Sequence, residues 1–226
     1  MELMFNISSI AEEEKYTNSK KDILKYLKII GVDTRFISYT PQKIYINNLR
    51  FSKFSRKRQE TFNKQYPQIQ VIRNSLFQKI CSKTAKTLSN LKPNSTILIP
   101  ENNHMINIIL EPYTRKYGLK LVNNGSYDFK AIPITLDDEV NQIFSNIFHG
   151  EGLKFNKKQN EIYPLINVPI EWINSFLKMD NEPQIKNTGN DELAISFMEF
   201  LEDVAPQYRE NVLKATQFIE SKLTSS

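Results

Sequence analysis

Two adjacent aspartates begin the stretch of sequence whose residue types are best suited to chemistry. Asp137 and Asp138 stand before an amphipathic run that ends in a Gly-x-Gly at Gly150 and Gly152. Carboxylates can hold the Mg²⁺ of a bound nucleotide, and backbone N–H groups at helix N-termini bind phosphate. The same carboxylates can instead cap the free N–H groups of a core helix and stabilise its dipole. From these residues alone, a nucleotide-binding corner and a capped core helix both stay open.

A dense cluster of cations lies earlier in the chain, in RFSKFSRKRQETFNK (residues 50–64). Clustered cations neutralise nucleic-acid phosphates, and exposed aromatic rings stack on unpaired bases. A solvated basic helix would have the same composition, and for Phe51, Phe54 and Phe62 a place in the core is the expectation. We predict a basic, RNA-facing segment over about residues 50–92. Its RNA-binding residues would be Arg50, Lys53, Arg56, Lys57, Arg58, Lys64, Lys79, Lys83 and Lys86.

The charge of the chain is unevenly distributed. The net charge is +5, but residues 20–92 hold 17 Lys and Arg against three acidic residues, a balance of +14. The rest of the chain therefore carries −9. Segregation of this size is typical of a protein with a polyanionic partner.

Several classes of protein are excluded or disfavoured by composition. Cys81 is the only cysteine, which excludes a disulfide framework and a CxxC zinc cage, and two histidines are too few for most metal sites. We expect His104 to start a helix and His149 to end one. No stretch approaches the roughly 20 apolar residues of a membrane span, and a signal-peptide pattern is lacking. The expectation is a cytoplasmic protein with no metal, no cofactor and no membrane partner.

The elements that must position these residues alternate along the chain. Strand-like and helix-like segments follow one another from about Ile69 to Phe148, which predicts an α/β domain with a mostly parallel sheet flanked by helices. A helix and a short hairpin (residues 34–40 and 43–48) precede it. We predict an α/β domain over 1–180, a polar linker over 181–190 and a C-terminal helical pair over 191–226, whose second helix would start at Pro206. The apolar faces of the pair would be Leu193, Phe197, Phe200, Leu201 and Val204, and Tyr208, Val212, Ala215, Ile219 and Leu223.

Three blocks between Thr135 and Leu223 resemble, in consistent order, the PP-loop ATP pyrophosphatases that modify tRNA. The run TLDDEVNQIFSNIFHGEGL is similar to their second signature, and YPLINVPIEWINSFL to their Pro-Leu block with its helix. The terminal DELAISFMEFLEDVAPQYRENVLKATQFIESKL resembles the segment that follows. The resemblance implies a PP-loop, Rossmann-like fold.

The departures from this family are as informative as the matches. Active members carry a Ser-Gly-Gly-x-Asp-Ser loop that cradles pyrophosphate, whereas this chain has Glu101, Asn102 and Asn103 after its buried strand TILIP and no Gly-Gly anywhere. Pro133 and Ile134 replace the Gly-His of the second signature. The resemblance therefore implies a degenerate nucleotide-site motif at Asp137, Asp138, Gly150 and Gly152.

The function implied by this resemblance is that of a non-catalytic subunit in the 2-thiolation of the tRNA wobble uridine. Such a subunit would bind tRNA and a catalytic thiolase subunit as a heterodimer, with a ubiquitin-like sulfur carrier reached through the complex. One alternative is a divergent ATP-dependent tRNA-modifying enzyme in which Asp137 and Asp138 contact ATP or Mg²⁺. Another is a structural protein-interaction module whose basic face binds an acidic protein surface.

Overall fold

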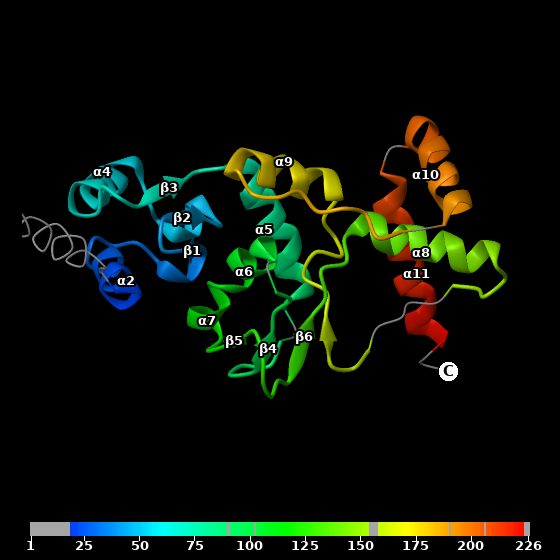
Figure 1. Ribbon diagram of the computed structural model, residues 1–226, viewed down its shortest axis with the longest axis horizontal. Coiled ribbons are helices and arrows are strands. Elements are labelled where there is room, and N and C mark those ends of the chain that lie inside the picture. Colours follow the sequence, from blue (N-terminus) through cyan, green and yellow to red (C-terminus); the bar gives the residue numbers. More distant parts are fainter. Residues whose placement is uncertain are drawn as a thin grey trace, which may run out of the picture.

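The computed structural model describes residues 19–223, apart from 90, 102, 154–157, 190 and 206. The first 18 residues of the expected α/β domain and the expected helix start at Pro206 lie outside this part of the chain. Figure 1 shows an elongated molecule with a small sheet at one end, a parallel sheet below the centre and three helices at the other end. None of the described helices is long and apolar enough to cross a membrane.

The N-terminal lobe is built on a three-stranded sheet with the order β1-β2-β3. The expected hairpin is confirmed, because β1 and β2 pair antiparallel with Ser38 opposite Tyr45. β3 runs parallel to β2. The helices cover an apolar cluster that includes Ile44, Phe54 and Phe62. The elements of this lobe are α2 Lys20–Ile29, η2 Thr34–Phe36, β1 Ile37–Tyr39, β2 Lys43–Ile46, α3 Leu49–Ser52, α4 Arg56–Gln65 and β3 Gln70–Ile72.

The second sheet has four strands, all parallel, in the order β5-β4-β6-β7. The expected α/β fold with a mostly parallel sheet flanked by helices is thus confirmed (Figure 1). Ile97, at the centre of β4, is fully buried, whereas Thr96 and Leu98 beside it are half-buried, so one face of this strand is less covered than a continuous apolar run predicts. The elements are α5 Ser75–Thr87, β4 Thr96–Leu98, α6 His104–Leu110, α7 Tyr113–Lys116, β5 Lys120–Val122, β6 Phe129–Ala131, β7 Glu161–Ile162 and α9 Ile170–Asp180.

One strand of the expected alternation belongs elsewhere. We counted the segment at Ile69 as the start of the parallel sheet, but β3 pairs with β2 in the N-terminal lobe. A strand that pairs parallel to its neighbour fits the strand–helix alternation in either sheet. The alternation alone therefore could not tell which strand β3 pairs with. Residues 37–72 therefore form a sheet separate from the four-stranded one.

Three helices form the C-terminal part and share an apolar cluster around Val140 and Phe144. They are α8 Leu136–Phe148, α10 Glu192–Val204 and α11 Tyr208–Leu223. The expected apolar faces of the last two are partly wrong. On α10 the inward residues include Ala194 and Met198, and on α11 they include Leu213. The expected core residues that are exposed instead are Leu193, Phe200, Val204, Ala215 and Ile219.

Candidate functional site

The direction in which successive strands are added to the parallel sheet reverses between β4 and β6. From β4 the chain passes through α6 and α7 to β5 on one side, and later returns to place β6 on the other side. In open α/β sheets, ligands bind in the crevice outside the carboxyl ends of the strands at such a reversal. The residues that leave these two strands and start α6 and α8 are therefore the first place to look for a site.

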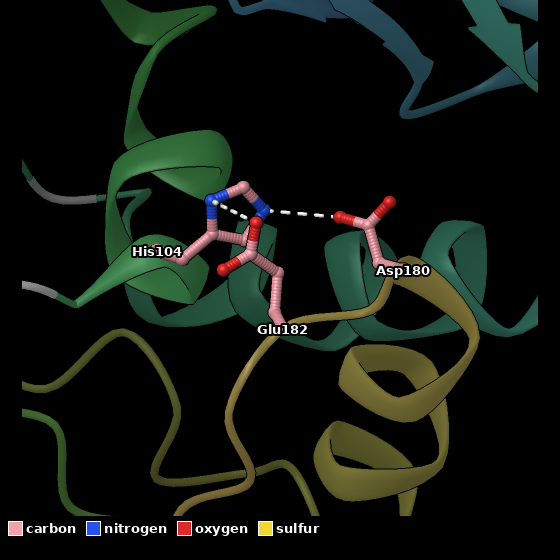
Figure 2. Close-up of side chains that lie close together, drawn as sticks. All are labelled: His104, Asp180 and Glu182. Atoms are coloured by element: carbon pink, nitrogen blue, oxygen red, sulfur yellow. Dashed lines mark hydrogen bonds and ion pairs between the residues drawn. The ribbon is translucent and has the colours of Figure 1, made fainter.

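His104 is the first residue of α6, directly after the β4 loop. Its imidazole lies between two carboxylates, as Figure 2 shows. Nε2 is 3.1 Å from Oδ2 of Asp180, and Nδ1 is 3.8 Å from Oε1 of Glu182. Asp180 is the last residue of α9 and Glu182 stands just beyond it. We call these three residues the His104 cluster.

Asp180 ties the His104 cluster to the N-terminal sheet. Its Oδ1 accepts from Nζ of Lys43 at 2.7 Å, and its Oδ2 accepts from the hydroxyl of Tyr45 at 2.7 Å. The Asp180 side chain is only 4% exposed, so Lys43 supplies the charge balance that a buried carboxylate requires. Burial, followed by the hydrogen bond to Asp180, raises the pKa of Tyr45 and keeps its hydroxyl a donor.

A cavity of about 540 Å³ opens beside the His104 cluster, between the β1–β2 turn and α6. Its wall combines apolar surface with polar side chains and both signs of charge, so a ligand could be oriented there by a few polar contacts. We refer to it as the β1–α6 cleft. Its lining includes Tyr39, Lys43, His104, Asn107, Glu111 and Glu182.

Glu111 fixes the far wall of the β1–α6 cleft. Its carboxylate accepts from the backbone N–H of Tyr39 at 2.9 Å and pairs with Lys20 at 2.9 Å and with Arg115 at 2.7 Å. Burial alone would raise the pKa of this carboxyl, but Arg115 and Lys20 together lower it below its usual value. Glu111 is therefore a charged anchor that joins α2, β1 and α7.

The aspartate pair expected to contact a nucleotide is used for internal hydrogen bonds. Thr135 and Asp138 form a reciprocal capping box at the start of α8. Asp138 also accepts from the backbone N–H of Thr188 at 2.6 Å and from its hydroxyl at 2.8 Å. Asp137 accepts from the N–H of Ile170 at 2.7 Å and pairs with Arg209 at 2.9 Å. Burial, only partly offset by these partners, raises the pKa of Asp137.

The two glycines of the same motif lie at the other end of α8. Gly150 and Gly152 adopt positive φ angles of 73° and 75°, and neither has a heavy atom within 4 Å of the position a Cβ would take. Gly150 follows the C-cap His149 and ends the helix, as expected. Since 13 helical residues rise about 20 Å, the aspartates and the glycines do not share one pocket.

The predicted linker residues contact the body of the protein. Thr188 holds Asp138, and the backbone of Ile185 exchanges two hydrogen bonds with the side-chain amide of Asn174 on α9. The segment therefore runs against α8 and α9 along a fixed path. A domain boundary at 181–190 stays a prediction.

The predicted RNA-binding cations fall into two groups. Those on α3, α4 and the turn between them are exposed, except for Arg58, which is half-buried and donates to the backbone carbonyl of Lys53. The α5 group lies against the C-terminal part. There Lys83 pairs with Glu210 at 2.5 Å, and Lys79 and Lys83 both lie over the ring of Trp172. The exposed cations are Arg50, Lys53, Arg56, Lys57, Lys64, Lys79 and Lys86.

The phenylalanines between these cations are mainly core residues. Phe54 and Phe62 are fully buried and pack edge to face, with ring centroids 6.0 Å apart. Phe51 is exposed and lies 5.3 Å from the ring of Phe36. Only Phe51 among the three thus offers a ring face to solvent in this segment.

Sequence reasoning missed the His104 cluster. His104 was expected only as a helix start, and Asp180 and Glu182 as part of, or next to, a polar linker. They are brought together by the tertiary fold, and His104 and Asp180 are 76 positions apart in the sequence. No spacing in the sequence signals this cluster, because its residues and Tyr45, which donates to Asp180, come from distant parts of the chain.

No protein-family model matches the chain, and no curated protein matches its sequence. Among solved structures, the fold is similar to that of the U34-tRNA thiolase NcsA from Methanococcus maripaludis with its 4Fe-4S cluster. The TM-score is 0.50 at 14% sequence identity, and the similarity covers 70% of this chain and 84% of that chain. At this identity the similarity concerns the fold, and it agrees with the PP-loop, Rossmann-like architecture expected from the sequence.

Proposed function

We propose that this protein acts in tRNA modification as a non-catalytic subunit of a wobble-uridine 2-thiolation complex, in the manner of cytoplasmic tRNA 2-thiolation protein 2. In this proposal it works in the cytoplasm, binds tRNA through the basic residues of α3 and α4, and holds a catalytic thiolase subunit. A ubiquitin-like sulfur carrier would reach the complex through that subunit. The support comes from the fold, the sequence resemblance and the state of the carboxyl edge of the sheet.

The observation that carries the proposal is that both helix N-termini at this edge are capped by the protein itself. Asn103 accepts from the N–H of Ile106 at the start of α6, and Thr135 and Asp138 close the start of α8. A phosphate would need these same N–H groups. None of the six glycines of the chain stands between β4 and α6, so the backbone lacks the residues that let a loop wrap a phosphate.

This arrangement favours the silent subunit over the divergent ATP-dependent enzyme. In that alternative Asp137 and Asp138 would contact ATP or Mg²⁺. Their oxygens already receive N–H and hydroxyl hydrogens or face Arg209. A metal ion would have to displace these partners at a buried position, which costs several of the hydrogen bonds that hold α8. We therefore expect no ATP turnover by the pure protein.

The tRNA surface is tested by the salt dependence of binding. The variant R56A/K57A/K64A removes three exposed cations of α4 and spares Arg58, whose guanidinium has a structural contact. The slope of log K against log salt should fall by about two to three, since each phosphate contact contributes about 0.9. Lys214→Ala, an exposed lysine of α11, is the matched control and should leave the slope unchanged. An unaltered slope in the triple variant would remove α4 from the tRNA site.

The partner surface that we propose is an apolar stripe on α10. Leu193, Phe200 and Val204 are each about 60% exposed and recur at i, i+7 and i+11, so they lie along one line of the helix. No Lys or Arg occurs between Asp191 and Val204, and the helix carries Glu192, Glu199, Glu202 and Asp203. The matching surface on the catalytic subunit would therefore be apolar with a basic rim.

Loss of this contact can be separated from loss of folding. Phe200→Asp should abolish formation of the heterodimer with the thiolase subunit in analytical ultracentrifugation. Phe218→Asp changes an equally exposed phenylalanine, 63% exposed on α11, and should leave the heterodimer intact. A heterodimer that survives Phe200→Asp would place the partner elsewhere. Binding of tRNA with no heterodimer at all would leave only an RNA-binding protein.

A further inference from the structure

The His104 cluster has the composition of a metal site. His104, Asp180 and Glu182 each offer one ligand atom, and these atoms all lie within 4.8 Å of one another. In Figure 2 the three side chains converge from α6, from the end of α9 and from the segment after it. We propose that these three side chains bind a divalent metal ion of the zinc class at the wall of the β1–α6 cleft.

The spacing of the ligand atoms suits such an ion. Nε2 of His104 and Oδ2 of Asp180 are 3.1 Å apart. Two ligands bound to one tetrahedral zinc at about 2.1 Å are about 3.4 Å from each other, so the pair needs to open by only a few tenths of an ångström. Glu182 faces the other ring nitrogen, with its Oε1 3.8 Å from Nδ1, so its side chain must turn toward Nε2 to become the third ligand. Glu182 follows the end of α9, its side chain is a third exposed, and the ion pair described for it is the one with His104.

The groups behind the ligands hold the site in place. Lys43 occupies Oδ1 of Asp180, and the hydroxyl of Tyr45 takes one lone pair of Oδ2, so the other lone pair of Oδ2 points toward His104. Hydrogen bonds of this kind orient metal-binding carboxylates in proteins. Asp180 is also buried, so its position is set before any ion arrives.

The local charge balance favours a cation. Asp180 and Glu182 contribute two negative charges and Lys43 one positive charge, so the cluster with a neutral imidazole has one unbalanced negative charge. Binding of a divalent ion would change the net charge of the cluster from −1 to +1. Histidine nitrogen and carboxylate oxygen both bind zinc, and catalytic zinc sites have three protein ligands and keep the fourth position open. Here that position would face the β1–α6 cleft, which His104 and Glu182 line.

The competing occupant is a proton on His104, because an imidazolium between two carboxylates uses the same geometry. A direct titration separates the two. The full chain, freed of metal with a chelator, is titrated with zinc chloride in a calorimeter and with Co²⁺ under visible absorption. The proposal expects one equivalent of each ion to bind, with the intense bands of four-coordinate Co²⁺.

Three variants locate the ion. Glu182→Gln should weaken zinc binding at least tenfold. Since it removes no other described side-chain contact, this variant is expected to fold as the natural chain does. His104→Ala should abolish the Co²⁺ bands. His149→Ala is the matched control, since His149 is the other histidine of the chain and also stands beside a carboxylate, 3.5 Å from Asp191. This variant should bind zinc as the natural chain does.

Other outcomes overturn the proposal. Absence of stoichiometric binding would leave a proton as the sole occupant, and binding that survives His104→Ala with Glu182→Gln would place the ion elsewhere. Circular dichroism of each variant checks that the fold is kept. The titration contains no tRNA and no partner, so its result is independent of the proposed function.

Discussion

Replacing Asp138 by asparagine tests whether this carboxylate holds the fold or a ligand. Asp138 is 7% exposed and its two oxygens accept four hydrogen bonds. They come from the N–H and hydroxyl of Thr135, at 2.9 and 2.6 Å, and from the N–H and hydroxyl of Thr188, at 2.6 and 2.8 Å. Asparagine has nearly the same shape but turns one of the two acceptors into a donor.

The size of the effect follows from these contacts. The hydroxyls of Thr135 and Thr188 can rotate away, but whichever backbone N–H faces the new amide stays unmatched. One unsatisfied buried donor costs about 1–3 kcal/mol, and the weakened capping box adds about 1 kcal/mol. We expect Asp138→Asn to lower the free energy of unfolding by about 3 kcal/mol. For a chain of this size that corresponds to a fall of about 6–12 °C in the melting temperature.

The assay is thermal unfolding with and without MgATP. Asp203→Asn, an exposed aspartate on α10, is the control and should change stability by less than about 0.5 kcal/mol. If Asp138 only caps α8, MgATP shifts neither protein. The reasoning would be refuted if Asp138→Asn melts like the natural chain, or if MgATP stabilises the natural chain and not the variant, because a ligand stabilises only the state that binds it.

Three further predictions follow from the charged and buried groups. Lys43→Met should lower the free energy of unfolding measured in urea by about 3 kcal/mol, because the buried carboxylate of Asp180 loses its lysine partner. The double variant K43M/D180N, which also removes the carboxylate charge, should recover most of this loss. Glu111→Gln should destabilise most near neutral pH. The lowered pKa of Glu111 gives stability that is present above the unfolded value of about 4.3 and is lost as the pH falls through the folded value, so urea titrations at decreasing pH should show the difference shrink. Burial raises the pKa of the Cys81 thiol, so alkylation by iodoacetamide at about pH 8 should be slow in the native protein and fast in urea.

The sequence predicted best what local chemistry determines. Asp138 takes part in the capping box at the start of α8, which is one of the two roles that a carboxylate before an apolar run allowed. The TILIP run forms a strand of the parallel sheet, although Thr96 and Leu98 are only half-buried. Such features depend on neighbours within a few residues, so they can be read without a structure.

What failed depends on contacts between distant residues. Periodicity located the helix α10 but not its inner face. Ala194 and Met198 turn inward, and the larger Leu193 and Phe200, about 100° around the helix, stay exposed. The most apolar stripe of a helix is normally the face that packs in the core. An apolar stripe that stays exposed is typical of a surface that contacts another molecule. The His104 cluster escaped notice for a similar reason, since no spacing along the chain joins α6 to the end of α9.

The proposed function requires a PP-loop-like fold that lacks its phosphate site and keeps its core. The apolar cluster of the parallel sheet includes Ile97, Ile106 and Ala131, which lie in β4, α6 and β6 and not in the loop between β4 and α6. A glycine-rich loop is costly because glycine loses the most conformational freedom on folding, whereas an asparagine cap stabilises a helix start by about 1 kcal/mol. Asn103 therefore favours the fold at the position where glycines would favour a phosphate. Under the proposed function, the partner carries out the ATP chemistry, so this chain needs no glycines in the loop between β4 and α6. Substitutions in this loop are then expected to favour residues that stabilise the fold.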